Sequence, residues 1–533
     1  MNVFFHACSN WAANVAINHS KNILESLKFF SCFFVLRTFV RRMKQLLIFA
    51  LILVSFSSCR KNSFYEGGDA KLEFSTDTVF FDTVFTSLGS STERLVIFNP
   101  YSENLVIQEL RLAKGKDSKF RLNVDGIAGK SHEGIEIPAN DSIFVFVEVT
   151  IDPNRSDAPL VESDSILLQT NGNLQDVDLV AWGQDAYYYR PTTLIPGLPV
   201  FSRLSSYTEP PYFFGDTVEW FNDKPHVIYG YLLVDTTFTL KIHAGTQVHF
   251  YNNSGLWVGP GSALSVRGEK DNEVVFQGSR LEDYFQDRPG QWDRIWINEG
   301  GRSVIQHAII KNGFVGLQCE AWPFNEPLVY AENPVVIQNT VIQNMVGIGL
   351  LARDHKIEAE NLVIYDCGTH SLAVNGGGTY DFIHCTFANY WSGNRSEPMV
   401  LVNNYFTNYL GVETTRDLSH LYFGNSIIFG SKEEELKIDE DESGIFDLTF
   451  DHCILRTKQD TSDLANYESV IFNPSSSFGV NPVFTSTFDD DYSLYAESAA
   501  VDSGKVNINK LNEDILGTMR DAIPDIGAYE YKP

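Results

Sequence analysis

His307-Ala308-Ile309-Ile310 is the first of six copies of one short pattern in the C-terminal half of the chain. In every copy a His or Asn comes first and a hydrophobic residue comes last. The last residues of successive copies lie 32, 22, 23, 41 and 27 positions apart. A period in the low twenties with occasional insertions predicts a stacked solenoid, in which each repeat supplies one coil. The other copies are Asn339-Thr340-Val341-Ile342, Asn361-Leu362-Val363-Ile364, His384-Cys385-Thr386-Phe387, Asn425-Ser426-Ile427-Ile428 and His452-Cys453-Ile454-Leu455.

A second shared piece follows the first copies of the pattern. Asn312-Gly313-Phe314-Val315-Gly316-Leu317 parallels Asn344-Met345-Val346-Gly347-Ile348-Gly349-Leu350. Together the two pieces resemble the coils of right-handed parallel β-helices of the pectate-lyase-like class. Asn and Gly suit the corners, where the backbone leaves β geometry, and the aliphatic residues suit an inward stack. The repeated His or Asn is therefore expected to be structural, with corner side chains hydrogen-bonded between adjacent coils. The resemblance implies a right-handed parallel β-helix over residues 201–533.

Residues 71–186 predict a separate all-β domain. Short alternating hydrophobic runs are separated there by turn residues, and Asn171-Gly172 is a strong signal for a tight hairpin turn. About seven strands in this length suit an immunoglobulin-like β-sandwich. Ile137-Pro138-Ala139-Asn140-Asp141-Ser142 resembles a motif of immunoglobulin-like modules in envelope and ciliary proteins, which implies a spacer role. The proline-punctuated residues 187–200 are predicted to be the linker to the helix.

The N-terminus predicts the compartment. Met43-Lys44-Gln45 precedes an apolar run, which ends at Ser57-Ser58-Cys59. This pattern resembles the signal peptide and lipobox of bacterial lipoproteins, which implies that Cys59 is acylated and becomes the new N-terminus. The alternative is an ordinary secretory signal. We expect residues 1–58 to comprise an upstream extension and the signal peptide, with the true start at Met43, and residues 59–70 to be a tether. The implied location is the cell envelope of a Gram-negative bacterium, with the protein held to the outer membrane by its lipid on the periplasmic or surface side.

The charge of the chain restricts its partners. The formal net charge is −28, and the basic first 58 residues make the remainder still more acidic. A surface of this sign repels nucleic acid and anionic lipid, so no nucleic-acid partner is expected. The chain has no C-x-x-C pair, which argues against a zinc ribbon or a redox pair. Cys385 and Cys453 occupy the same position of the repeat and are expected in the core.

The catalytic motifs of related folds are missing. Pectin-degrading hydrolases on this fold carry adjacent aspartates and a Gly-His-Gly turn, and lyases carry calcium-binding carboxylates with an Arg or Lys base; neither arrangement stands out in the repeats. No cofactor is evident, and calcium is possible at the acidic insertion 432–442. Asp514, Asp525 and Glu530 belong to a C-terminal segment like that of many extracellular β-helix proteins. A polar cap on the last coil explains them better than an acid pair.

Two insertions between repeats carry the candidate ligand residues, Trp322 and Trp391. Each Trp lies among polar residues, a composition that suits stacking on sugar rings, although packing against the helix would also explain either one. We expect both on the same flank of the solenoid. The favoured function is a non-catalytic module that binds glycan or an envelope protein. The alternative is a polysaccharide lyase or glycoside hydrolase acting on extracellular polysaccharide.

Overall fold

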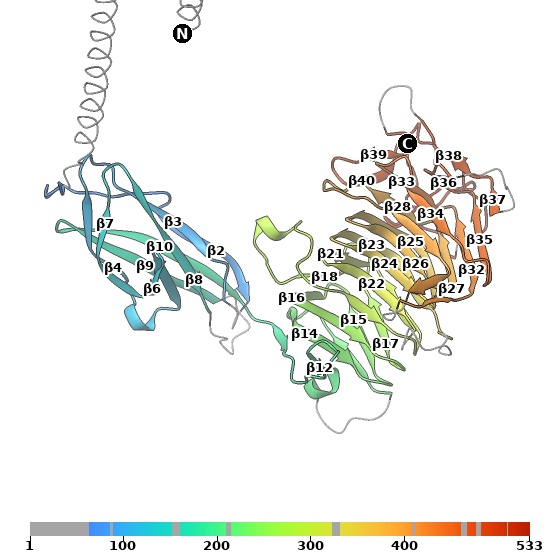
Figure 1. The fold of residues 1–533 in the computed structure, drawn as a ribbon, viewed down its shortest axis with the longest axis horizontal. Coiled ribbons are helices and arrows are strands. Elements are labelled where there is room, and N and C mark those ends of the chain that lie inside the picture. The colour runs from blue at the N-terminus through green and yellow to red at the C-terminus, as the bar shows by residue number, and fades with distance from the viewer. Residues whose placement is uncertain are drawn as a thin grey trace, which may run out of the picture.

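The computed structural model describes residues 63–85, 89–151, 160–208, 215–321, 331–407, 411–459, 466–475, 481–508 and 510–533. These residues form a β-sandwich and a longer coiled body of parallel strands (Figure 1). The chain is therefore all-β, as predicted. No helix among the described residues is long and apolar enough to cross a membrane. Cys59 lies outside the described residues, as does Trp322.

The sandwich consists of two five-stranded sheets over one apolar core. Alternation decides which side chains face that core: in β8, the residues Ile143, Val145, Val147 and Val149 are buried. Pairing is antiparallel throughout, except that β2 runs parallel to β10. In sheet order the strands are β1 (Glu73–Phe74), β3 (Glu93–Phe98), β8 (Ser142–Val149), β5 (Phe120–Val124) and β6 (Ile127–Gly129), and then β2 (Thr78–Phe85), β10 (Asn173–Gln184), β9 (Leu160–Thr170), β4 (Leu105–Leu112) and β7 (Ser131–Ile137).

The hairpin turn predicted in this domain is confirmed. Asn171 and Gly172 have φ values of 47° and 85°, and they join β9 to β10, whose first pair is Thr170 with Asn173. Left-handed backbone at both central positions matches the twist of the flanking strands, which is why Asn-Gly signals such a turn.

The second body is a parallel β-helix. Its 26 strands form three walls, and each strand pairs in parallel with the equivalent strand of the next coil. Along the chain each coil passes through wall A, wall B and wall C in turn. Wall A contains β11 (Tyr187–Tyr189), β18 (Val274–Gly278), β21 (Ala308–Lys311), β28 (Thr386–Asn389), β33 (Ile427–Gly430), β36 (Ile454–Leu455) and β38 (Ile471–Phe472).

Walls B and C complete the coils. Wall B contains β12 (Phe201–Arg203), β19 (Ile295–Ile297), β22 (Val315–Glu320), β24 (Ile348–Arg353), β26 (His370–Asn375), β29 (Val400–Asn403) and β34 (Leu436–Asp439). Wall C contains β13 (Thr217–Trp220), β15 (Thr239–His243), β17 (Ala263–Arg267), β20 (Ser303–Gln306), β27 (Gly378–Ile383), β32 (Leu418–Gly424), β35 (Phe446–Asp451) and β37 (Tyr467–Glu468). Long strands bend around corners: β14 (His226–Val234) and β16 (Gln247–Val258) span walls A and B, whereas β23 (Val335–Met345) and β25 (His355–Cys367) span walls C and A.

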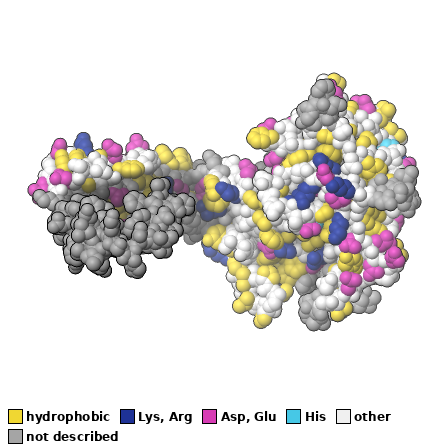
Figure 2. Space-filling model, turned by 45° about the horizontal axis from the view of Figure 1, so that its top comes forward, with side chains coloured by type: hydrophobic (Ala, Val, Ile, Leu, Met, Phe, Trp, Pro, Cys, Tyr) yellow, Lys and Arg dark blue, Asp and Glu magenta, His cyan; other side chains and the backbone are white. Residues whose placement is uncertain are grey.

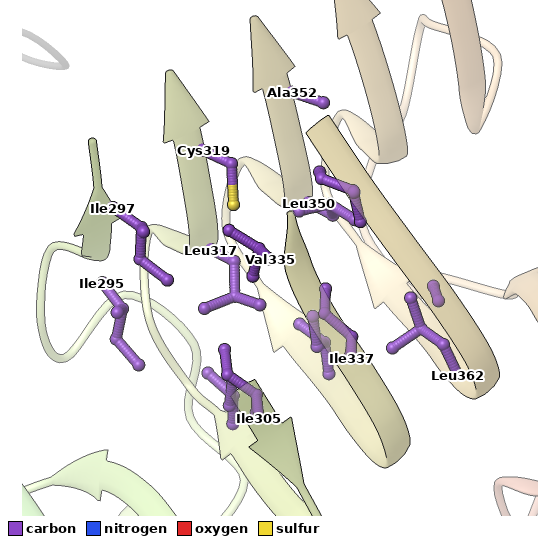
Figure 3. Close-up of a cluster of buried hydrophobic side chains, with 14 of the residues drawn as sticks. Ile295, Ile297, Ile305, Leu317, Cys319, Val335, Ile337, Leu350, Ala352 and Leu362 are labelled. Atoms are coloured by element: carbon purple, nitrogen blue, oxygen red, sulfur yellow. The ribbon is translucent and has the colours of Figure 1, made fainter. Parts of the chain in front are cut away.

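The interior of the helix is a continuous apolar stack. Leu317 on β22 pairs with Ile295 on one side and Leu350 on the other, and all three are fully buried (Figure 3). Side chains that repeat at one position therefore lie over one another, so each coil buries the apolar face of the previous one. Cys385 and Cys453 lie fully buried in this core, as expected.

The repeated His or Asn marks the corner between walls C and A. All six of these residues have φ between 45° and 52°, the left-handed region in which Asn is the favoured non-glycine residue. The corner side chains also bond between coils: Asn361 Nδ2 donates to Asn339 Oδ1 at 2.8 Å, and Asn425 Nδ2 lies 3.1 Å from His384 Nε2. The predicted structural role and the predicted ladder are both confirmed. The six residues are His307, Asn339, Asn361, His384, Asn425 and His452.

The boundary between the two bodies differs from the prediction. Residues 187–189, predicted to be linker, form β11, the first strand of wall A, which pairs in parallel with β14. The sandwich packs on the outer side of this wall through Phe85, whose ring lies 4.8 Å from that of His249 and clusters with Ala186 and Val227. The tyrosines of the supposed linker are thus strand and contact residues, and this explains why an aromatic run interrupts a proline-rich segment.

The C-terminal segment also differs from the prediction. From Asn481 onward it packs along the outer side of wall A, where Val483, Phe484, Tyr492 and Ile526 contact Ile427 and Phe429. Its backbone carbonyls meet the corner ladder: Asn361 Nδ2 donates to Glu513 O at 2.8 Å and Asn425 Nδ2 to Lys505 O at 2.9 Å. These contacts are those of a strap along the flank rather than of a cap on the last coil. The strap includes one antiparallel pair, β39 (Phe484–Ser486) with β40 (Asp491–Leu494).

Candidate functional site

The outer side of wall A is largely occupied, by the sandwich at its first coils and by the C-terminal strap at its later coils. Wall B, in contrast, carries two adjacent columns of outward side chains that run along the helix. The columns arise because a parallel register places equivalent residues of successive coils next to each other, about 4.8 Å apart. We treat this face of wall B as the candidate functional site.

The first column is mainly apolar, and it begins with two stacked tryptophans on β16 and β19. The rings of Trp257 and Trp296 are 5.1 Å apart at 13° to each other, and Trp296 is only partly buried. Register continues the column from Trp296 to Gln318 and Leu351, and then to Ala373 and Leu401. Trp296 and Leu401 are partly exposed in this column, whereas Trp257, Gln318, Leu351 and Ala373 are buried, with exposed fractions of 2–6%.

The second column is polar and lies two residues along each strand. Glu320 pairs with Arg353 across β22 and β24, and Asn375 pairs with Asn403 across β26 and β29. Asn403 pairs in turn with Asp439 on β34. Amides, carboxylates and a guanidinium thus repeat at the spacing of the coils beside the first column.

A hydrogen-bonded network crosses the first coils of this face. Arg294 contacts Asp293 at 2.8 Å and also donates to the side chain of Gln318, and Gln318 Nε2 donates to Glu320 Oε2 at 2.8 Å. Glu320 then meets Arg353 at 3.5 Å. Tyr231 completes the network through its hydroxyl, which donates to the carboxylate of Asp293.

Burial controls the charge of the central carboxyl. The Glu320 side chain is only 6% exposed, and this desolvation raises its pKa, while Arg353 and Gln318 act in the opposite direction. Desolvation likewise raises the pKa of Tyr231, so its hydroxyl stays a proton donor to Asp293. Asp293 and Glu320 are separated by Arg294 and Gln318, so the arrangement suits hydrogen bonding to a polar ligand better than a paired acid and base.

The two tryptophans predicted to bind sugar follow strands of different walls. Trp391 follows β28 of wall A, whereas the insertion with Trp322 follows β22 of wall B. The two insertions therefore leave different corners of the coil, and that both tryptophans lie on the same flank of the solenoid stays a prediction. Their corners border the two edges of wall B. The side chain of Trp322 lies outside the described residues.

Trp391 is partly buried at the edge between walls A and B. A Cβ atom added at Gly393 would clash with the indole, so this glycine makes room for Trp391, whereas one at Gly368 would be in ordinary contact with the ring at 3.5 Å. The loop that carries it is held by Arg395, which forms two bonds of 2.7 Å to the fully buried carboxylate of Glu435. The position of Trp391 beside wall B is therefore fixed by its own loop.

Wall C carries a more strongly charged cluster, but most of its groups already have protein partners. Glu358 meets Lys510 at 3.0 Å, and Asp381 meets His420 at 3.1 Å. Glu360 accepts the backbone N–H groups of residues 510 and 511 at 2.8 Å each, and burial raises its pKa. These bonds fasten the C-terminal strap to the helix.

The three acidic residues of the C-terminal segment have structural roles in the strap. Asp514 caps a turn by accepting the N–H of Leu516 and of Thr518, at 2.9 and 2.6 Å. Glu530 pairs with Arg520 at 3.1 Å, and both side chains are at most 3% exposed. Asp525 accepts two backbone N–H groups at 2.7 and 2.6 Å, and burial raises its pKa to about 6. The preference for a structural role over an acid pair fits these contacts, although the location is the flank.

No group of three or more potential metal ligands occurs within the described ranges. In the acidic insertion, Glu433 is paired with Lys458, Glu434 accepts from Thr457 at 2.7 Å, and Glu435 is paired with Arg395. On the face drawn in Figure 2, Lys and Arg side chains lie among Asp and Glu rather than in one continuous basic patch.

Comparison with known proteins gives only remote likenesses. No protein-family model matches the chain, and no curated protein matches it. Among solved structures, the pectate lyase Pel9A is similar over 65% of this chain and 88% of its own, with 11% identity and a TM-score of 0.27. A PapD-like domain of human CEP192 is similar over 24% of this chain and 94% of its own, with 10% identity and a TM-score of 0.16. A family 123 glycoside hydrolase from Clostridium perfringens covers 21% of this chain and 25% of its own, with 9% identity and a TM-score of 0.15. With TM-scores this low, the fold assignment rests on the strand pairing described above.

Proposed function

We propose that this protein binds a polysaccharide along wall B without cleaving it, as part of a lipid-anchored envelope protein. The observation that carries the proposal is the pair of columns on wall B, one mainly apolar and one polar, repeating with the coils. A sugar ring has an apolar face and a polar rim, so a polysaccharide can place ring faces on Trp296 and Leu401, the partly exposed members of the first column, and hydroxyls on the second column. Trp296, whose ring stacks on the buried ring of Trp257, provides the partly exposed aromatic surface of this column.

The positions of the two carboxyl groups in the hydrogen-bonded network of wall B favour binding without cleavage. Hydrolysis of a glycosidic bond uses two carboxyl groups that face the same bond from either side. On wall B, Arg294 and Gln318 separate the two carboxyl groups of the network. Polysaccharide lyase or hydrolase activity is the alternative, and on wall B the raised pKa of Glu320 favours it, because a general acid needs a carboxyl that keeps its proton.

We infer that the β-sandwich acts as a spacer between the membrane and the β-helix. Its two packed sheets, ten strands and one core support an immunoglobulin-like assignment, and we infer a right hand for the β-helix because parallel crossover connections are almost always right-handed. The signal-like residues 43–59 support anchorage through Cys59, with the acyl chains held in the outer membrane.

Replacing Cys59 is expected to abolish lipid attachment. Growth with a fatty-acid analogue should label the wild-type protein, whereas Cys59→Ala should carry no label because it lacks the thiol that is acylated. Cys319→Ala, which removes a different cysteine of the mature chain and keeps Cys59, is the matched control and should label normally. Equal labelling of the wild type and Cys59→Ala would contradict anchorage at this residue.

Removing one polar group from wall B is expected to weaken polysaccharide binding without unfolding the protein. Asn375 is partly exposed, and no hydrogen bond of its side chain to another described residue is recorded, so Asn375→Ala should cost the helix little. Losing one ligand hydrogen bond of about 1 kcal/mol lowers affinity about fivefold. A glycan array should identify the polysaccharide, and calorimetry should then compare Asn375→Ala with Thr379→Ala, an outward residue of wall C. Equal affinities of both variants and the wild type would argue against wall B.

A further inference from the structure

A pocket lies at the far end of the helix, along the edge between walls A and B. Its volume is about 500 Å³, within the range of roughly 300–1,000 Å³ that is usual for small-ligand sites. The residues that line it lie in or follow β33, β36 and β38, the last three strands of wall A. Three successive corners of the helix therefore contribute to its lining. The lining residues are Phe429, Glu433, Arg456, Thr457, Lys458, Asn473, Pro474, Ser475 and Pro482.

Arg456 is the group in this pocket best placed to bind a ligand. Its guanidinium lies over the ring of Phe429, 4.9 Å from the centroid, and Nη1 donates to Gly430 O at 2.7 Å. These two contacts orient the guanidinium plane while leaving donors that form no recorded hydrogen bond with the described residues. A fixed guanidinium with donors available on one edge matches the two oxygens of a carboxylate.

The other polar groups of the pocket are engaged with one another. Lys458 pairs with Glu433 at the exposed rim, so their charges offset each other. The amide of Asn473 bonds both the N–H and the C=O of Thr457, at 3.0 and 2.9 Å. Glu434, which is not a lining residue, accepts from the Thr457 hydroxyl and from Lys458 N–H. These hydrogen bonds hold the lining of the pocket in place. Pro474 and Pro482 add apolar surface to the lining, on which one face of a ring can pack.

We propose that this end pocket binds a carboxylated sugar unit, with Arg456 as the partner of the carboxylate. The volume accepts a ring of this size, the prolines offer it an apolar face, and the oriented guanidinium accounts for the charge. The site is separate from the columns of wall B, so it stands or falls independently of the proposed function.

The test is calorimetry of the full mature chain with glucuronate, glucose and acetate as probes. Glucuronate should bind, and glucose, which lacks the carboxylate, should bind at least about tenfold more weakly, as should acetate, which lacks the ring. Arg456→Gln should weaken glucuronate binding about tenfold or more, because a bidentate charge-assisted contact is lost. Arg302→Gln, an exposed arginine of wall C, is the matched control and should bind like the wild type.

A second variant guards against misfolding of the first. Ser475→Trp leaves Arg456 in place but fills the pocket from its exposed lining, so it should also abolish glucuronate binding. Circular dichroism and thermal melting should show that both variants keep the β-helix. Equal binding of glucose and glucuronate, an unchanged affinity in folded Arg456→Gln, or no glucuronate binding at millimolar concentration would each overturn the proposal.

Discussion

Arg395→Met is expected to destabilise the β-helix by about 3–5 kcal/mol, because it leaves a buried carboxylate without its cation. Glu435 is fully buried and Arg395 is 3% exposed, and two bonds of 2.7 Å join them. Glu435 also accepts the N–H of Met399 and of Lys432. Its carboxylate therefore joins the loop that carries Arg395 to the backbone on both sides. The denaturant midpoint, followed by circular dichroism, measures the loss.

A double variant separates the charge effect from a packing effect. In Arg395→Met/Glu435→Gln the buried charge is gone, while the glutamine oxygen can still accept backbone N–H groups, so most of the lost stability should return. Both variants should also weaken polysaccharide binding if Trp391 contributes to it, because the salt bridge holds its loop. A midpoint for Arg395→Met equal to that of the wild type would contradict the assigned role of the pair.

Phe423→Ala is expected to cost a similar amount, about 3–5 kcal/mol, for a different reason. Phe423 is fully buried on the inner side of wall C, and its ring lies between those of Phe382, at 5.2 Å, and Phe450, at 5.0 Å. Truncation leaves a cavity in a stack whose neighbours are fixed by strand pairing and cannot move together. Because each coil rests on the previous one, the loss should be largest for the coils after β32.

Hydrogen exchange read out by mass spectrometry should locate this loss along the helix. In Phe423→Ala, amides of the last coils should exchange faster, while those of β14–β18 should keep their wild-type rates. Phe314→Ala is the matched control, because that ring is 48% exposed and its removal should change stability by well under 1 kcal/mol. Equal effects of the two substitutions would contradict the stacked core.

The corners and the core could be read from the sequence because each coil repeats the same physical requirement. Asn361 needs a left-handed backbone and a partner in the next coil, and Ile364 needs a buried neighbour, so both recur at one period. The turn at Asn171 is equally local, since two residues decide its geometry. Sequence reasoning succeeds where a residue and its immediate neighbours fix the structure.

The candidate site was harder to predict, because it depends on register between distant segments. Asn375 and Asn403 form one column only because β26 and β29 pair in that register, despite a long insertion between them. One signal was available: counting forward from the corner residues His307, Asn339 and Asn361 places Glu320, Arg353 and Asn375 at 13, 14 and 14 positions, which nearly aligns them. Nothing in the spacing of the repeats revealed that the C-terminal strap covers wall A, because that contact joins residues far apart in sequence.

Radical footprinting of the protein with and without its polysaccharide tests the central claim most directly, because it reports side-chain protection on each wall. We expect protection of Trp296 and Leu401 on wall B, and of Trp391 at its edge, when the polysaccharide is bound. Tyr422, a partly exposed residue on the outer side of wall C, should be modified equally in both states. Protection of Tyr422 with wall B unchanged would contradict the assignment of wall B as the binding face.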